Sequence, residues 1–378
     1  MSKKLTESEI RSILNTADED LVRKFPGLTR RELRAVKKAH APDRIDVSAE
    51  VSKRVEYDKT RMINARHEAA LREIRRLQSE LDAAGKMPEA RPADLTVKTE
   101  PGEREATAVA VASDWHAEER VVREKVNGLN EYNLDIFHER SSWFFTNTAK
   151  LLRKERKAIP VRHLVLIQGG DMTSSNIHDD LMESNQLGPI DAMTLVQDHW
   201  CGGIKKLLED VPDDVSITVI LKCGNHPRIT TKQRVQTEEA NSLEWYTAHN
   251  LARYFEGNKR VKIVRDRAYH TYLDVYGRQI RIHHGHAINY QGGVGGITIP
   301  VNKAISEWNK GRPAYLDIFG HFHQLFWGPN FIANGSLIGY SPYAVKIKAP
   351  YQDPAQAFCL LDSKFGLTVR APILLEAA

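Results

Sequence analysis

The sequence has few cysteines and no long apolar run, and both absences exclude classes of protein. Its three cysteines, Cys201, Cys223 and Cys359, are far apart and odd in number, and no Cys-x-x-Cys pair occurs, which argues against a disulfide framework. No stretch of about 18 apolar residues is present, and the opening MSKKLTESEIRS lacks the apolar segment of a signal peptide. We therefore expect a cytoplasmic protein that does not span or bind a membrane.

The remaining composition is that of an ordinary globular protein. Its 378 residues, 41% hydrophobic and 27% charged, are enough for one large domain and a smaller one, each with its own core. Most of the formal net charge of +5 comes from the first hundred residues. Because this excess is small, its local arrangement decides whether it indicates a nucleic-acid partner.

Residues 1–45 predict a small helical module that is similar to a helix-turn-helix. Apolar residues recur at helical spacing, Pro26 and Gly27 separate two helices, and Thr29 with Glu32 forms a capping-box pattern. The third helix carries five cations outside its apolar stripe: Arg30, Arg31, Arg34, Lys37 and Lys38. In a helix-turn-helix such cations contact DNA phosphates and base edges. The alternative is a small helical bundle with a solvated basic face.

The next two segments predict a long helix and a linker. Within 46–85, apolar and small residues repeat in heptads along a seam from 63 to 81: Ile63, His67, Ala70, Ile74, Leu77 and Leu81. This seam either pairs two copies of the chain as a homodimer or lies against the following domain. Residues 86–106 contain three prolines and few apolar residues, so they predict a semi-rigid linker.

From 107 to 378, short apolar strands alternate with helices, which predicts an α/β domain. Five of the predicted strands end in residues with oxygen or imidazole donors. These ends are Asp114-Trp115-His116, Gly169-Gly170-Asp171, Gly224-Asn225-His226, His283-His284-Gly285-His286 and Gly320-His321-Phe322-His323. Ligands of α/β folds gather beyond the carboxyl ends of strands, so we expect these motifs to form one site.

In this order the five motifs resemble those of the calcineurin-like metallophosphoesterases, over roughly residues 107–370. The resemblance implies a β-sandwich flanked by helices and a site for two divalent metal ions. It assigns Asp114, His116 and His323 to one ion, Asn225, His284 and His321 to the other, and Asp171 to both. His226 matches the histidine that approaches the scissile phosphate in this family. His283 and His286 lie close enough in sequence to compete with His284 as the ligand.

The donor types agree with this chemistry. Two cations about 3.5–4 Å apart bind phosphate oxygens, lower the pKa of a bridging water and neutralise developing charge. Imidazoles with carboxylates favour Mn²⁺, with Fe or Zn as alternatives. The hypothesis is that a metal-bridging hydroxide attacks the phosphoester, that Asp171 is essential, and that His226 stabilises the transition state or protonates the leaving oxygen.

Three functions fit these motifs. The first is a phosphodiesterase that acts on DNA, a nuclease recruited by residues 1–45. The second is a phosphomonoesterase, or a phosphodiesterase of small or cyclic nucleotides, whose amino-terminal region serves dimerisation or partner docking. The third, a DNA-binding regulator with an inactive enzyme-like domain, is disfavoured because every motif ligand is present.

Two further runs, 292–308 and 333–362, resemble bacteriophage-encoded metallophosphoesterases, for which the host cytoplasm would be the location. The likeness to SbcD-like DNA repair nucleases is more distant, because an ATPase partner domain and long coiled-coil arms are absent.

Three residues near the motifs are candidates for substrate contact. Trp115 could stack on a base, although packing is the interpretation we favour. Arg228 could hold a phosphate oxygen or pair with a surface acid, and the sequence does not choose between these. His178 follows Asp171 in a segment that we expect to line the groove, where it is a weaker candidate.

Overall fold

The structure is a computed structural model that describes residues 5–40, 54, 61–62, 65, 68–70, 72, 95–97, 103–290 and 296–376. It divides into two units, Met1–Ala90 and Arg91–Ala378, and we describe each by itself. Most of the long helix predicted for 46–85, including most of its seam, lies outside the described residues, so the homodimer stays a prediction. Among the helices that the structure describes, none has both the length and the apolar character needed to cross a bilayer.

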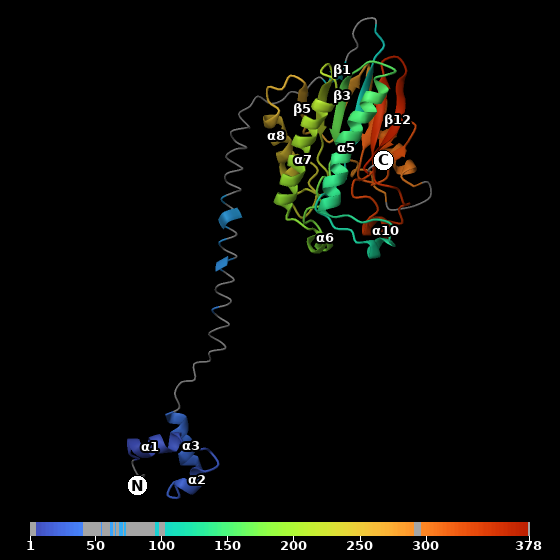
Figure 1. Ribbon diagram of the computed structural model, residues 1–378. Coiled ribbons are helices and arrows are strands. Elements are labelled where there is room, and N and C mark those ends of the chain that lie inside the picture. The colour runs from blue at the N-terminus through green and yellow to red at the C-terminus, as the bar shows by residue number, and fades with distance from the viewer. Residues whose placement is uncertain are drawn as a thin grey trace. The chain divides into compact units, whose positions relative to one another are not determined.

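The amino-terminal unit contains three short helices (Figure 1), which pack around a small apolar core. They are α1 (Glu7–Leu14), α2 (Leu21–Lys24) and α3 (Arg30–Ala39). The fully buried apolar residues are Ile13, Leu21 and Leu33. The capping box predicted before α3 is confirmed: the Thr29 backbone N–H donates to Glu32 Oε2 at 2.8 Å, and the Glu32 N–H donates to Thr29 Oγ1 at 3.4 Å.

One of the five cations assigned to DNA contact is used inside this unit. Lys37 Nζ donates to Asp18 Oδ1 at 2.7 Å and to the Thr16 carbonyl at 2.5 Å, so it joins α3 to the turn that follows α1. The Lys37 side chain is partly exposed, so its role as a DNA contact stays a prediction. Arg30, Arg31, Arg34 and Lys38 are exposed.

The second unit contains two six-stranded mixed sheets flanked by helices, which confirms the predicted α/β class. The first sheet has the order β12-β11-β2-β3-β4-β5. Its strands are β2 (Ala106–Ala112), β3 (Val161–Gln168), β4 (Ser216–Leu221), β5 (Val261–Arg265), β11 (Ala355–Asp362) and β12 (Gly366–Leu374). The central strands β2 to β5 are parallel.

The second sheet has the order β1-β6-β7-β8-β10-β9. Its strands are β1 (Thr96–Val97), β6 (Thr271–Val275), β7 (Arg278–Ile282), β8 (Leu316–Phe319), β9 (Phe326–Trp327) and β10 (Phe331–Ala333). The edge strand β1 lies inside the segment predicted to be a linker. It pairs with β6, and Leu95 beside it is buried, so part of 86–106 belongs to the sheet.

The two sheets pack face to face, and helices cover their outer faces (Figure 1). The longer helices on the first sheet are α5 (Leu134–Glu155), α7 (Pro189–Asp210) and α8 (Leu243–Tyr254), and α9 (Thr298–Gly311) covers the second. Strand β2 shows why the layers form. Its even-numbered alanines pack against the helices, while Val109 and Val111 face the other sheet, because alternate side chains of a strand share a face. Small alanines let α5 approach the sheet closely.

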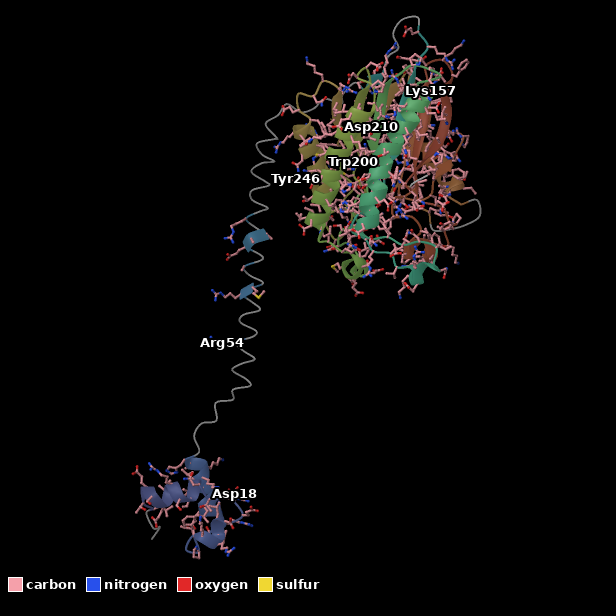
Figure 2. The ribbon with its side chains drawn as sticks, in the orientation of Figure 1. Asp18, Arg54, Lys157, Trp200, Asp210 and Tyr246 are labelled. Atoms are coloured by element: carbon pink, nitrogen blue, oxygen red, sulfur yellow. The ribbon has the colours of Figure 1, made fainter. Side chains whose placement is uncertain are left out.

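The direction of the chain places the strand ends. Lys157, just beyond α5, and Asp210, at the end of α7, lie at one end of the second unit (Figure 2). From there the chain enters β3 and β4, so their carboxyl ends point to the opposite end. The short helices α6 (Asp179–Ser184) and α10 (Pro342–Ile347) lie at that opposite end (Figure 1).

Candidate metal centre

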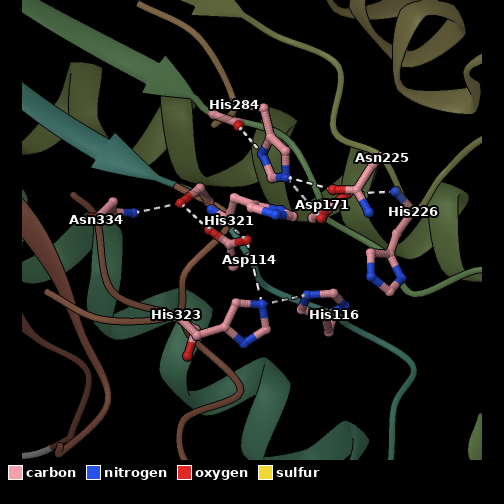
Figure 3. Close-up of polar contacts among 12 residues, drawn as sticks. Asp114, His116, Asp171, Asn225, His226, His284, His321, His323 and Asn334 are labelled. Carbon is pink, nitrogen blue, oxygen red and sulfur yellow. Dashed lines mark hydrogen bonds and ion pairs between the residues drawn. The ribbon is translucent and has the colours of Figure 1, made fainter. Parts of the chain in front are cut away.

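Residues that follow five strands of the two sheets gather in one cluster of polar side chains, which Figure 3 shows. In the first sheet, Asp114 and His116 follow β2, Asp171 follows β3, and Asn225 and His226 follow β4. In the second sheet, the ends of β7 and β8 deliver His284, His321 and His323. The structure thus brings together residues separated by more than half of the chain.

The first group of possible ligands joins Asp114, His116 and His323, which we call the first cluster. One ligand atom from each lies within 4.8 Å of the others. His116 Nε2 and His323 Nε2 are 3.1 Å apart, and His323 Nε2 lies 3.5 Å from Asp114 Oδ1. Three donors converging at such distances leave room for one cation between them.

The second cluster joins Asp171, His284 and His321 by the same 4.8 Å criterion. His284 Nε2 lies 2.9 Å from Asp171 Oδ2 and 3.2 Å from Asn225 Oδ1. The two clusters are adjacent, because the backbone N–H of His321 donates to both carboxylate oxygens of Asp114 at 3.0 Å. That Asp171 bridges two ions stays a prediction.

The register of β7 decides which of its three histidines faces the cluster. Ile280 and Ile282 point into the space between the sheets, so Arg281 and His283 point to the other face. There His283 stacks on Phe319 with ring centroids 5.0 Å apart. His286 Nε2 pairs with Glu238 Oε1 at 2.9 Å. His284 is the histidine of the three that contacts Asp171.

The backbone at the site is in an uncommon conformation. Nine non-glycine residues in the described part of the chain have a positive φ, and five of them are predicted ligands. These are Asp114 (φ 55°), His116 (47°), Asp171 (54°), His321 (72°) and His323 (54°). Such conformations are rare outside glycine and cluster at functional sites, where the surrounding structure holds them. Their concentration here indicates that ligand placement outweighs backbone preference.

Two glycines leave the space that the carboxylates occupy. A Cβ on Gly224 would lie 2.1 Å from Asp171 Oδ1, and one on Gly320 would lie 2.3 Å from Asp114 Oδ2. Any larger residue at either position would displace a ligand. These two glycines therefore let the backbone pass close to the site.

The hydrogen bonds of Ser174 fix the tautomer of His116. The hydroxyl of Ser174 has one proton, which it donates to Glu119 Oε2 at 2.7 Å. It must then accept from His116 Nδ1, which lies 2.7 Å away. His116 consequently carries its proton on Nδ1 and presents the Nε2 lone pair to the first cluster, as a metal-binding histidine does.

His284 is oriented by a backbone carbonyl. Its Nδ1 lies 2.8 Å from the Gly169 oxygen, which can only accept, so Nδ1 donates. The other nitrogen, Nε2, faces the oxygens of Asp171 and Asn225. A bare lone pair would repel these oxygens, so the arrangement needs a proton or a metal ion between them. The donor set therefore fits a divalent cation at this place.

Burial keeps three of the imidazoles neutral. It lowers the pKa of His323 to about 4 and the pKa values of His116 and His321 well below the ordinary value. For His284, burial is outweighed by the Asp171 carboxylate, which raises the pKa to about 10. Neutral imidazoles are the form that binds metal, so His116 and His323 of the first cluster are in that form near pH 7.

The two carboxyl groups differ in their surroundings. Burial raises the pKa of Asp114 to about 7, although the nearby charge of His284 opposes the rise. Burial acts in the same direction on Asp171, but His284 and His226 outweigh it and hold the pKa of Asp171 well below its ordinary value. Asp171 is therefore the anion around which the imidazoles gather.

Several residues that support the site belong to none of the five sequence motifs. Glu244, buried at the start of α8, accepts hydrogen bonds from the backbone N–H groups of Met172 at 2.8 Å and Gly224 at 2.6 Å. It thereby fastens the loop after β3 to the loop after β4. Asn334 donates to Ser113 Oγ at 2.8 Å, and Ser113 donates to Asp114 Oδ2 at 2.5 Å. Sequence reasoning missed these residues, along with Ser174 and Glu119.

Two of the predicted substrate contacts have structural roles. Trp115 is fully buried, stacks on Trp200 with ring centroids 5.7 Å apart and lies among the phenylalanines of α5. It is a core residue, which agrees with the packing interpretation that the sequence favours over substrate contact. Arg228 donates to the carbonyls of Asn225, Thr230 and Thr231. Its guanidinium therefore holds the loop after β4, which neither of the predicted alternatives anticipated.

Two histidines lie at the open side of the site. His226 is fixed by its backbone N–H, which donates to Asp171 Oδ1 at 2.7 Å, and by Nδ1, which lies 3.2 Å from the Ser174 carbonyl. Its ring centroid is 4.9 Å from that of His116. His178, just before α6, has its ring centroid 6.2 Å from that of His226. Both stand beside the first cluster.

Comparison with known proteins assigns no family to this arrangement: no family model matches the chain, and no curated protein matches it.

Proposed function

We propose that the chain is a phosphodiester hydrolase that depends on two divalent metal ions, of the calcineurin-like metallophosphoesterase type, and that its substrate is DNA. The observation that carries the proposal is the pair of adjacent clusters, in which imidazole nitrogens converge on two buried carboxylates. Hydrogen bonds from Nδ1 aim the Nε2 lone pairs of His116 and His284 inward, which is the orientation that ligation requires.

When bound, two divalent cations hold phosphate oxygens, lower the pKa of a water and neutralise charge that develops during displacement; Mn²⁺ fits the donor types best, with Fe or Zn as alternatives. The remaining roles in the reaction fall to the chain's own side chains. Asp171 and Asp114, both buried, would supply negative charge to the cations. His226, whose Nδ1 donates to the Ser174 carbonyl, would carry a second proton on Nε2 in its imidazolium form and give that proton to the leaving oxygen.

DNA is favoured over a small ester by the exposed cations of α3. Arg30, Arg31, Arg34 and Lys38 lie on the surface of the amino-terminal unit, where they can bind phosphates without sequence preference. Binding of DNA there would raise the substrate concentration near the metal centre. The alternative substrates, phosphomonoesters and small or cyclic nucleotides, would gain nothing from this unit.

The test uses the full chain loaded with Mn²⁺. It is offered linear duplex, single-stranded and supercoiled DNA, and in parallel bis-p-nitrophenyl phosphate and p-nitrophenyl phosphate. Cleavage of DNA together with a diester rate far above the monoester rate supports the proposal. Turnover of the monoester alone contradicts the nuclease assignment, and turnover of none contradicts the enzyme assignment.

A matched pair of variants tests the metal centre independently of activity. His284→Asn removes a nitrogen that faces Asp171, whereas His286→Asn removes a neighbouring histidine that pairs with Glu238. We expect Mn²⁺ binding, measured by calorimetry, to weaken strongly in the first variant and to stay near wild type in the second. Equal loss in both variants would contradict the ligand assignment.

A further inference from the structure

A short helix beside the first cluster exposes an aromatic ring between the metal centre and two cations. Tyr343, in α10, is 55% exposed, and its ring centroid lies 6.4 Å from that of His323. Lys346 and Lys348, at the end of the same helix, are also exposed. The ring therefore lies on the surface next to a proposed metal ligand, where it can contact a substrate.

A hollow lies between α10 and the first cluster. The residues that line it include Phe322, His323, Tyr340, Tyr343, Ile347 and Pro350. Asp353 also lines the hollow, but its carboxylate accepts a hydrogen bond from the Tyr351 hydroxyl at 2.9 Å. Tyr343 in its lining offers an aromatic ring on which a planar group can stack.

The walls of the hollow are held in place before any ligand binds. The Ser341 hydroxyl caps α10 by accepting from the Ala344 N–H at 3.4 Å. Across the hollow, Gln352 accepts from the Leu325 N–H at 2.9 Å and donates to the Leu325 carbonyl at 3.3 Å. Leu325 follows His323 closely in the chain, so these bonds tie the segment after α10 to the ligand loop. Binding there would cost little reordering.

We propose that Tyr343 stacks on a base of a single-stranded nucleic acid whose phosphate lies at the metal centre, with Lys346 and Lys348 beside the neighbouring phosphates. Stacking on an exposed ring accepts any base, and cations along the backbone supply the rest of the affinity. This inference rests on the proposed function and adds a substrate class to it: the site takes an unpaired strand. Two exposed lysines beside an exposed ring match a phosphate backbone and its bases, so a nucleic acid is the occupant that we infer.

The test separates the base from the phosphate. The full chain hydrolyses bis-p-nitrophenyl phosphate while a short thymidylate oligonucleotide, or an abasic oligonucleotide of equal length and charge, competes for the site. We expect wild type to bind the thymidylate strand about ten-fold more tightly than the abasic strand, a ratio that corresponds to about 1.4 kcal/mol. Tyr343→Ala should bring this ratio close to one, and Tyr343→Phe, which keeps the ring, should preserve it.

Tyr254→Ala is the matched control, because Tyr254 is 49% exposed and lies at the end of α8. It should leave the ratio at the wild-type value. If wild type hydrolyses the ester but both strands compete equally, or if Tyr343→Ala keeps the preference, the inference is wrong while the proposed function stands. If wild type does not hydrolyse the ester, the proposed function itself fails.

Discussion

The two units of the chain differ in where their charged groups lie. Between residues 5 and 40, three apolar side chains form the core, and nearly all charged groups are exposed to water. At the metal centre, Asp114, Asp171 and His284 are at most 1% exposed and depend on hydrogen bonds for their orientation. A sum of exposed charges changes gradually when one is removed. A buried cluster fails when one member is removed, because the other charges are left without partners.

The largest effect should follow from Asp171→Asn. The amide keeps the shape of the side chain but removes the anion around which His284 and His226 gather. Loss of an outer partner of a metal ligand already costs about 10–100-fold, so we expect hydrolysis of bis-p-nitrophenyl phosphate to fall by more than about 100-fold. DNA binding by the amino-terminal unit, measured by fluorescence anisotropy, should not change. Undiminished turnover would mean that the buried centre tolerates the loss of one charge, as the exposed charges of the amino-terminal unit do.

The sequence predicts the sheet unit well because its signals are local. Strand β2 alternates small and larger apolar residues, and the ligand motifs stand directly behind the strands, where the fold needs turns. The sequence pattern does not show which of several neighbouring histidines is the ligand. His283, His284 and His286 cannot be ranked until the register of β7 is known, since one step along a strand changes the face.

The residues that support the site could not be predicted from the sequence either, but the reason is different. Glu244 binds the backbone N–H groups of Met172 and Gly224, and backbone groups leave no mark in the sequence. Trp115 stands between two ligands, so its neighbours suggest a site while its ring enters the core. Lys37 likewise belongs to a basic run, but only the packing of α3 shows that it turns to Asp18. In each case the missing information is tertiary.

Ser174→Ala should have the next largest effect. The substitution removes the hydroxyl that joins His116 Nδ1 to Glu119, so the imidazole loses the bond that fixes its tautomer. We expect metal affinity, measured by titration with Mn²⁺, to fall by about 10–100-fold. Ser175→Ala, one residue further along, is the matched control and should bind metal as wild type does. If both variants bind equally, the centre tolerates loss of an outer partner, and its contrast with the amino-terminal unit is weaker than we argue.

Acid should unfold the sheet unit before it affects the helical one. Burial lowers the pKa of His163 in β3 from 6.5 to about 4, so the folded state favours the neutral ring. The stability from this ring is present above pH 6.5 and is lost as the pH falls from 6.5 to about 4, because the unfolded chain takes up the proton first. The histidine in residues 5–40, His40, is exposed.

Thermal unfolding of the full chain between pH 7 and pH 4.5 measures this difference. His163→Gln keeps a group that can bond Ser216, whose Oγ lies 2.8 Å from His163 Nδ1, but it removes the titration. We expect the variant to lose fewer degrees of melting temperature than wild type over this range. An identical loss in both would mean that other groups control the acid response.

The smallest effect belongs to the surface cations, and it should be graded. Replacing Arg30, Arg31 and Arg34 by Gln should weaken DNA binding and reduce the slope of log affinity against log salt by about 0.9 for each phosphate that is no longer neutralised. Hydrolysis of bis-p-nitrophenyl phosphate should stay at the wild-type rate, since this ester needs no recruitment.

Lys37→Gln is the informative comparison. It removes the same charge from the same helix, but Lys37 is bound to Asp18 and Thr16. The salt slope should therefore stay unchanged while the helical unit melts at a lower temperature. A slope that falls equally for Lys37 would mean that net charge alone, and not its placement on α3, attracts the DNA.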